Sequence, residues 1–298
     1  MRVMMGEIDW LVCPADECPA GEWDGLDSQV AVGHACSVTA VAKADRHVSQ
    51  QPGFLSASEC EMFCRLVFPK RRREWLLGRW TAKRLLQRHL PCDAKHRLLP
   101  LRAITVGNDP DGAPYLAVEG EGRLPASLSI SHRGGRRYTC RRDASDPFSS
   151  TRAFCALSFS HSLSLGADIE RVEPRVPAFV HDYFTAREVE RVQACPPQAR
   201  DLLVTVLWSA KEAVLKALRL GLRVDTRRVE IGHVAGIMSY GTSSTDVSPG
   251  GWRPVWVKSD LAGGDHLLSW WRLDGDDVLT LAVVRSGEKP EIAISISV

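Results

Sequence analysis

The sequence has no run of about 18 consecutive apolar residues, the length that a membrane-spanning helix requires. Its amino terminus also lacks the long apolar stretch of a secretion signal. The sequence also has no large excess of charge of either sign, because it contains 38 basic and 36 acidic residues, for a formal net charge of +2. We therefore expect a cytoplasmic protein that binds neither membranes nor nucleic acid through its overall charge, so any anion site must be local.

Paired cysteines are missing as well. The nine cysteines are scattered, and none forms the C-x-x-C pairs that structural zinc sites and thioredoxin-like motifs use. Reduced thiols are the expectation, in keeping with a cytoplasmic location. With 298 residues the chain can bury a core without cross-links, either as one large domain or as two domains of ordinary size.

The sequence predicts that a helix begins after residue 55. Ser56 with Glu59, or Ser58 with Glu61, has the spacing of a capping box, in which a serine and a glutamate satisfy the free amides of a helix N-terminus. Helical sequence continues from there to about Leu90. The residues before it mix short apolar pieces with Gly, Pro and Ser, and predict no more than a strand or two.

The same arrangement recurs in the second half of the chain. Thr185 with Glu188 forms another capping box, about 129 positions later, and leads into helical sequence that ends near Leu220. In addition, WTAKRLLQ at 80–87 matches WSAKEAVL at 208–215 at an offset of 128. Chance similarity of two helices is the alternative, but two matches at nearly one offset favour two homologous halves.

Between and after these helices the apolar residues alternate with a period of two, which indicates β-strands and hairpins. Such segments lie at 126–131, 154–159, 163–169, 267–273 and 278–284. The chain is therefore predicted to be an α+β protein of two related subdomains, each a small antiparallel sheet packed with helices. We place the subdomains at 55–152 and 153–298, with residues 1–54 as an N-terminal segment that is part of the first.

One predicted strand carries two acids. In LSLGADIERV, residues 163, 165, 167 and 169 are apolar, so Asp168 and Glu170 lie on the other face, with backbones roughly 7 Å apart. Two carboxylates at this spacing can converge on one hard cation, and Gly166 leaves room beside them. The alternative is an ordinary half-exposed strand whose acids are solvated. Alone, Asp-x-Glu is a weak signal.

A second acid lies on the later helix. Apolar residues of 203–218 form one stripe that faces the core, and Glu212 and Lys216 are i,i+4 neighbours on the opposite face. A surface salt bridge is the simplest interpretation of that pair. The order of the two segments favours a functional one, because D-x-E is followed about 40 residues later by W-S-A-K-E-A-x-x-K.

With these segments the sequence resembles the surfactin-type 4′-phosphopantetheinyl transferases. The family has a strand-borne G-x-D-x-E and a helical W-x-x-K-E-x-x-x-K, and both are complete here. The matching positions are Gly166, Asp168, Glu170, Trp208, Lys211, Glu212 and Lys216. Upstream, FPKRRREWLLGRWTAKRLL resembles the Arg-rich segment and GR helix of the family, DGAPYL its G-x-P turn and SISH its Ser-His motif. The resemblance covers residues 55–235 and implies the pseudo-twofold fold of the family, with the active site between the subdomains.

Two departures from the family pattern bear on the site. An S-x-S-H string occurs both at 129–132 and at 158–161. The second precedes Asp168 so closely that FCALSFSHSLSLGADIE is interpreted as one hairpin, so we choose Ser131 and His132. This choice implies a polar, basic insertion at 133–152, which is interpreted as a tolerated surface loop rather than a carrier-contacting element. The lysine of the family's G-K-P turn is replaced by Ala113.

The resemblance implies transfer of the 4′-phosphopantetheine arm of coenzyme A to a serine of an apo acyl or peptidyl carrier protein, with release of 3′,5′-ADP. By resemblance, Asp168, Glu170 and Glu212 bind Mg²⁺, Glu212 is the general base, and Lys216 assists the leaving group. The residues expected to bind coenzyme A are basic or lie in the Ser-His motif: Arg72, Arg79, Ser131, His132, Lys211 and Lys216.

Two other classes of protein compete with this interpretation. A metal-dependent diphosphate hydrolase acting on a nucleotide or on coenzyme A would use the same acids, with water in place of the serine. A non-catalytic module that binds coenzyme A or a carrier protein is disfavoured, because the acids and Lys216 are intact. We expect a monomer, since two homologous halves in one chain complete the site, and a role in secondary metabolite biosynthesis.

Overall fold

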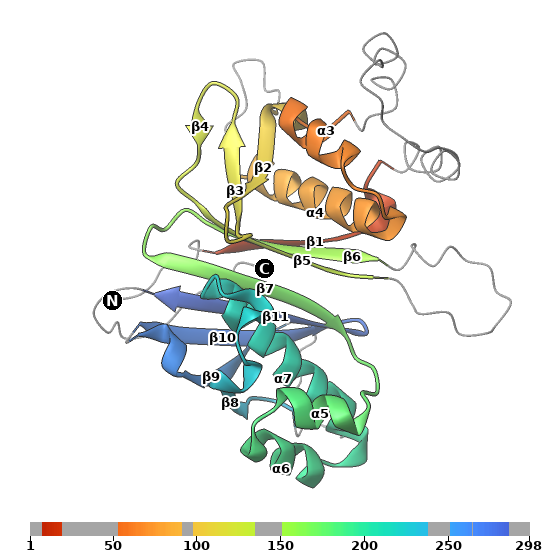
Figure 1. The fold of residues 1–298 in the computed structure, drawn as a ribbon, viewed down its shortest axis with the longest axis vertical. Helices are drawn as coiled ribbons and strands as arrows, with labels where there is room; N and C mark the ends of the chain where they lie inside the picture. The colour runs from red at the N-terminus through yellow and green to blue at the C-terminus, as the bar shows by residue number, and fades with distance from the viewer. Residues whose placement is uncertain are drawn as a thin grey trace, which may run out of the picture.

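The structure is a computed structural model, and it describes residues 8–19, 53–90, 98–134, 151–237, 251–263 and 265–285. Figure 1 shows two halves, one above the other, with α3, α4 and β1 to β6 in the upper half and β7 to β11 with α5 to α7 in the lower half. Each half combines small antiparallel sheet with helices, and the described strands form no closed barrel. The α+β prediction is confirmed.

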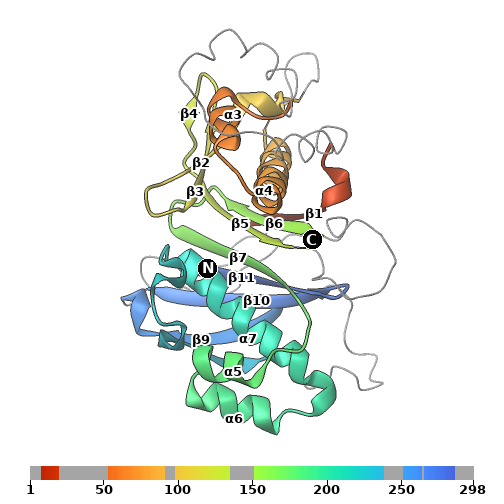
Figure 2. The ribbon, with the colours of Figure 1, turned by 45° about the vertical axis from the view of Figure 1, so that its right-hand side comes forward.

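The first half contains two small antiparallel sheets. One has the order β1-β6-β5, and the other has the order β2-β3-β4. Its elements are β1 (Asp9–Pro14), η1 (Ala15–Glu17), α3 (Ala57–Cys64), α4 (Pro69–Gln87), η5 (Leu101–Ala103), β2 (Ile104–Asn108), β3 (Pro114–Val118), β4 (Gly122–Arg123), β5 (Ser127–Arg133) and β6 (Arg152–Ser158). Helix α4 packs across the first of these sheets, against β1, β5 and β6 (Figures 1 and 2).

The second half has one antiparallel sheet, in the order β7-β11-β10-β9-β8. Its elements are β7 (Leu163–Arg171), α5 (Pro177–Tyr183), α6 (Ala186–Ala194), α7 (Pro197–Ala217), η6 (Gly221–Arg223), η7 (Thr226–Arg228), β8 (Val229–Val234), β9 (Arg253–Ser259), η8 (Asp260–Ala262), β10 (His266–Asp274) and β11 (Asp277–Arg285). Helix α7 packs on one face of this sheet, against β7, β11 and β10. The repeated WTAKRLLQ and WSAKEAVL segments therefore lie on corresponding long helices.

The two predicted capping boxes are confirmed, at Ser56 with Glu59 and at Thr185 with Glu188. The two long helical stretches are each interrupted, which corrects the predicted continuous helices. The chain leaves the helix before Pro69, which opens α4, and before Pro197, which opens α7. A proline ring disfavours helical geometry in the preceding residue but is tolerated in the first helical turn, so each proline marks the start of a new helix.

All five predicted strands are present, with ends that differ from the predicted ones by two residues or fewer. One pairing differs from the expectation, because β6 and β7 do not form a hairpin. A short turn joins them, yet β6 pairs with β1 and β5, whereas β7 pairs with β11. Of the predicted insertion, residues 135–150 lie outside the described residues.

Strand β7 is buried on both faces. Leu165, Ala167 and Ile169 pack in an apolar layer with Phe154 of the first half. On its other face β7 meets α7, and Gly166 is where the two come closest, since a Cβ there would lie 1.7 Å from the Ala213 carbonyl oxygen. Gly166 was expected to leave room for a cation. The space is instead filled by the α7 backbone, which brings the helix close to the acidic strand.

The cysteines of the described residues are all free thiols, as expected: Cys13, Cys18, Cys60, Cys64, Cys155 and Cys195. No helix within the described ranges is both long and apolar enough to span a bilayer.

Candidate functional site

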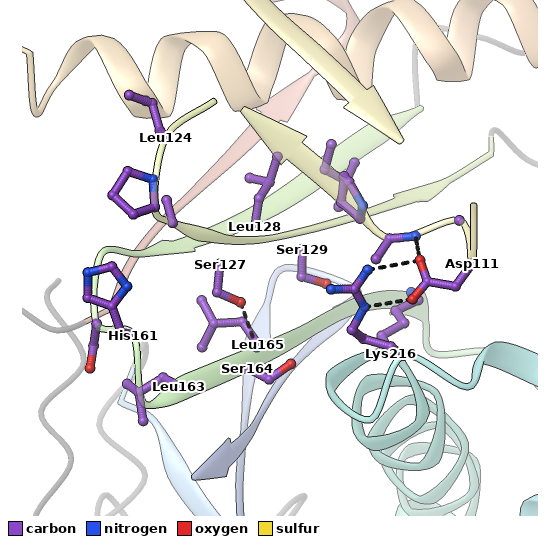
Figure 3. A pocket seen from close by; sticks show the side chains of 18 of the residues that line it. Asp111, Leu124, Ser127, Leu128, Ser129, His161, Leu163, Ser164, Leu165 and Lys216 are labelled. Carbon is purple, nitrogen blue, oxygen red and sulfur yellow. Dashed lines mark hydrogen bonds and ion pairs between the residues drawn. The ribbon is translucent and has the colours of Figure 1, made fainter. Parts of the chain in front are cut away.

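The two halves meet along a row of serines. Alternate residues of β5 point toward β7, so their hydroxyls lie beside the backbone of that strand (Figure 3). Ser127 Oγ accepts a hydrogen bond of 3.0 Å from the Leu165 amide, and Ser129 Oγ accepts one of 2.8 Å from the Ala167 amide. Side-chain hydroxyls thus replace the carbonyls of a regular strand ladder and set the register between the halves. The next serine of the row is Ser131.

Ser131 lies opposite Asp168. Its hydroxyl donates to Asp168 Oδ1 at 2.8 Å and accepts from Lys216 Nζ at 3.1 Å. Lys216 Nζ also contacts Asp168 Oδ1 directly, at 2.6 Å. The other carboxylate oxygen of Asp168 accepts a hydrogen bond of 2.7 Å from Ser209 Oγ. Asp168 is only 2% exposed, so these contacts compensate for the removal of its charge from water.

Glu170 and Glu212 complete the acidic group, but each has its own partners. Glu170 accepts a hydrogen bond of 3.3 Å from Trp208 Nε1 and one of 2.9 Å from Arg175. Glu212 Oε2 lies 3.7 Å from Lys216 Nζ, so the predicted i,i+4 pair is present. The strand and the helix therefore contribute acids to the same place, as their order in the sequence indicated.

The electrostatics of this group show that it carries more negative charge than its surroundings neutralise. Burial, followed by repulsion from Asp168, raises the pKa of Glu170 to about 7 and that of Glu212 to about 8. Burial alone would lower the pKa of Lys216, but the neighbouring Asp168 and Glu212 outweigh it and raise that pKa. The raised pKa values favour the protonated forms of Glu170 and Glu212, and a further cation bound beside them would lower both pKa values.

The donor set suits a hard divalent cation. Among the described residues no three acidic, histidine or cysteine side chains stand close enough together to form a metal centre as they are oriented. The Lys216 ammonium occupies the position beside Asp168 where a cation would bind, and the Arg175 guanidinium occupies the corresponding position beside Glu170. Three carboxylates that gather cations and supply only oxygen are ligands that Mg²⁺ prefers. Asp168, Glu170 and Glu212 therefore fit the predicted metal.

The basic residues predicted to bind phosphate differ in the protein contacts that their side-chain nitrogens make. Arg79 is 8% exposed; one of its terminal nitrogens donates to Asn108 at 2.9 Å, whereas its buried Nε has no protein partner. His132 lies on β5 near the seam, the place where the two halves meet, and its Nε2 lies 3.2 Å from Glu74. Arg72 donates to the Leu66 carbonyl at 3.2 Å and lies over the Phe63 ring. The buried Nε of Arg79 is therefore a donor that remains available to an anionic ligand.

Lys211 is not brought to this site. Its ammonium is 0% exposed and contacts Glu188 at 2.9 Å and the carbonyl oxygens of Thr226 and Val229. Three partners account for the three protons of an ammonium. Lys211 lies on the buried side of α7, whereas the next residue, Glu212, faces the seam.

A pocket of about 610 Å³ opens along the seam. Its walls come from β5, the start of β7, the β2–β3 turn and the end of α7 (Figure 3). Asp111 and Lys216 lie at one end, and His161 lies at the other. The S-x-S-H string that we did not choose therefore borders the pocket, but Ser131 of the chosen string contacts Asp168.

Two residues of the site escaped the sequence interpretation. Ser209 lies within the recognised W-S-A-K-E segment, and its position one helical turn before Glu212 places its hydroxyl near the same strand. That spacing could have suggested it. Arg175 lies in a loop five residues after Glu170, and no local pattern predicts that it turns back to Glu170.

Comparison with known proteins agrees with this geometry. Residues 164–252 match the model of the 4′-phosphopantetheinyl transferase superfamily. The matched stretch holds all three acids and Lys216, and it supports a transferase that moves phosphopantetheine, with coenzyme A and apo carrier proteins as the substrates of that superfamily. No curated protein matches the chain.

Proposed function

We propose that this protein transfers the 4′-phosphopantetheine arm of coenzyme A to a serine hydroxyl of an apo acyl or peptidyl carrier protein, in a Mg²⁺-dependent reaction that releases 3′,5′-ADP. The observation that carries the proposal is the position of Lys216. Its ammonium lies 2.6 Å from Asp168 and 3.7 Å from Glu212. An acid group and a proton donor thus stand together, and Lys216 of this group also lines the pocket of about 610 Å³.

In this reaction the serine oxygen of the carrier attacks the phosphorus that bears pantetheine, and the bond from that phosphorus to the bridging oxygen of the diphosphate breaks. Glu212 accepts the serine proton, directly or through water. Lys216 donates a proton to the departing 3′,5′-ADP oxygen or neutralises its charge. When bound to Asp168, Glu170 and Glu212, the divalent ion supplies positive charge that orients the diphosphate and keeps the carboxyls ionised.

The residues of the chain have further roles in the proposal. Ser131 orients Asp168 by donating to it, and Arg79, His132 and Arg72 supply positive charge or hydrogen bonds for the phosphates of coenzyme A. Positioning and electrostatic stabilisation account for most of the rate in such displacements. The two homologous halves support the surfactin-type subfamily and a monomeric enzyme. A cytoplasmic location and a role in secondary metabolite biosynthesis are part of the proposal through the resemblance to that subfamily.

The test is incubation of the purified protein with coenzyme A, Mg²⁺ and several apo carrier proteins, followed by intact-mass spectrometry. A phosphopantetheine adduct on a carrier, with an equal amount of 3′,5′-ADP, supports the transferase. If 3′,5′-ADP accumulates while no carrier gains mass, the protein is a diphosphate hydrolase and the proposal fails. Asp168→Ala and Glu212→Gln should abolish the adduct, whereas Asp225→Asn, at an exposed acid that forms an ion pair with Arg227, should not.

A further inference from the structure

Arg219 has an unusual backbone conformation. It follows α7 directly after the C-cap and has a φ of 60°, the only positive φ of a non-glycine residue within the described residues. The Leu220 amide donates to the Leu215 carbonyl at 2.9 Å, the bond that defines a Schellman helix end. Glycine normally occupies this left-handed position, since a side chain there strains the backbone. Residues in such strained conformations cluster at functional sites, so the contacts of the Arg219 side chain are of interest.

The Arg219 side chain crosses from one half of the protein to the other. Its Nε lies 2.7 Å from Asp111, and a terminal nitrogen lies 2.7 Å from Asp109, both in the turn that joins β2 and β3. Arg123 also contacts Asp109, at 2.7 Å. Two arginines therefore meet two aspartates. Because the charges balance, the group offers little attraction to an anion, and its geometry is that of a bridge.

The bridge continues through the turn to Arg79. Asp111 Oδ1 accepts a hydrogen bond of 3.0 Å from the Ala113 amide, which closes the turn. The Asn108 amide group donates to the Gly112 carbonyl at 2.8 Å, and its oxygen accepts from Arg79 at 2.9 Å. A chain of hydrogen bonds thus connects the end of α7 with the buried arginine of α4.

This bridge spans the pocket at its Lys216 end. Arg219 lies three residues after Lys216, and both line the pocket together with Asp111. Figure 3 labels Asp111 and Lys216 at this end. Several contacts hold the two halves together, among them the serine row, the apolar layer around Phe154 and the ion pairs of Arg133 and Arg152 with Asp277. The Arg219 bridge is the contact that joins the halves at the Lys216 end of the pocket. Ligand groups that must touch both halves need the distance between the halves to be fixed in advance.

We propose that Arg219 is a positioning residue, which holds the β2–β3 turn, and through it Arg79, in place against the end of α7 before coenzyme A binds. The proposal rests on the proposed function for the identity of the ligand, but the bridge itself can be tested without it.

The decisive variant is Arg219→Gly. Glycine adopts the observed φ without strain, so the helix end is preserved while the bridge is removed. We expect the KM for coenzyme A to rise about fivefold, the upper range for a partly exposed ion pair, with kcat changed less than about twofold. Asp111→Asn leaves the contact of Arg219 with Asp109 in place, so it should raise the KM for coenzyme A less than Arg219→Gly does. The double variant should be no worse than Arg219→Gly alone, because both lack the same bridge.

Arg228→Ala is the matched control. It removes an ion pair of similar exposure, 2.7 Å from Asp260, which stays within the second half. The KM for coenzyme A should therefore remain that of the wild type. Equal KM values for wild type and Arg219→Gly, or a KM increase in Arg228→Ala of the same size, would overturn the proposal.

A second measurement needs no ligand. Amide hydrogen exchange at Asp109, Gly112 and Ala113, whose N–H groups are all bonded within the turn, should be faster in Arg219→Gly than in wild type. Unchanged exchange would refute the bridge even if transfer is observed. Faster exchange in a protein that fails to modify any carrier would support the bridge and refute the transferase. A large loss of resistance to urea in Arg219→Gly would show a role in folding and also overturn the proposal.

Discussion

Lys83 and Lys211 lie 128 positions apart and make the same set of contacts in the two halves. Each ammonium is 0% exposed and pairs with the glutamate of the capping box that opens an earlier helix, Glu59 for Lys83 and Glu188 for Lys211. Each glutamate in turn accepts a hydrogen bond from a strand amide. The donor to Glu59 is in β2 and the donor to Glu188 is in β8. The duplicated lysine of the W-x-A-K segments therefore stabilises each half, and the pseudo-twofold relation of the halves extends to buried polar groups.

Replacing Lys211 with methionine should destabilise the protein. The variant leaves the Glu188 carboxylate buried without its cation, and breaking one partner of such a pair costs about 3–5 kcal/mol. Urea unfolding followed by tryptophan fluorescence measures the loss. Lys83→Met should cost a similar amount, since its surroundings match. If Lys211→Met instead unfolds like wild type and weakens coenzyme A binding, Lys211 is a ligand contact, as the family resemblance implied.

Glu212→Gln should remove activity and yet stabilise the metal-free protein at high pH. Folding raises the pKa of Glu212 from 4.5 to about 8, so the folded state holds a proton that the unfolded state releases. Stability contributed by this group is complete below about pH 4.5 and is lost as the pH rises toward 8. The glutamine variant escapes that loss. Its gain in unfolding free energy over wild type, measured in EDTA, should be larger at about pH 9 than at about pH 5. An equal gain at both values would contradict the raised pKa.

Addition of Mg²⁺ at neutral pH should release protons from the protein. Metal coordination requires ionised carboxylates, whereas burial and repulsion raise the pKa values of Glu170 to about 7 and of Glu212 to about 8 in the absence of metal. Calorimetric titrations in buffers of different ionisation enthalpy measure this release. Asp168→Asn should abolish the binding heat. Binding without proton release, or equal binding to the Asn variant, would place the metal elsewhere.

Gly166→Ala should weaken the contact between β7 and α7. The added methyl would lie 1.7 Å from the Ala213 carbonyl oxygen, so the helix must move away from the acidic strand. We expect a loss of about 3 kcal/mol in urea unfolding, the upper range for overpacking, together with a large loss of activity. Gly251→Ala serves as the control, because no atom lies within 4 Å of its added methyl and its φ is not positive. Wild-type stability in Gly166→Ala would contradict the close approach.

Much of the architecture follows from local sequence. Both capping boxes, the five strands and the i,i+4 pair of Glu212 and Lys216 depend on interactions within a few residues or on a short period, so the sequence alone was sufficient to predict them. The motif spacing also indicated that Glu212 of α7 and the acids of β7 lie near enough to interact electrostatically. The prolines at 69 and 197 are local as well, and would have allowed the helix breaks to be predicted.

Other features depended on tertiary structure because they join segments that are distant in the chain. No pattern in the sequence shows that Lys211 faces Glu188 while its neighbour Glu212 faces the seam, or that Gly166 serves the approach of α7. The pairing of Ser131 with Asp168, and of Arg219 with Asp111, exists only once the two halves are in contact. Sequence period determined which residues share a face, and packing of one half on the other decided which faces meet.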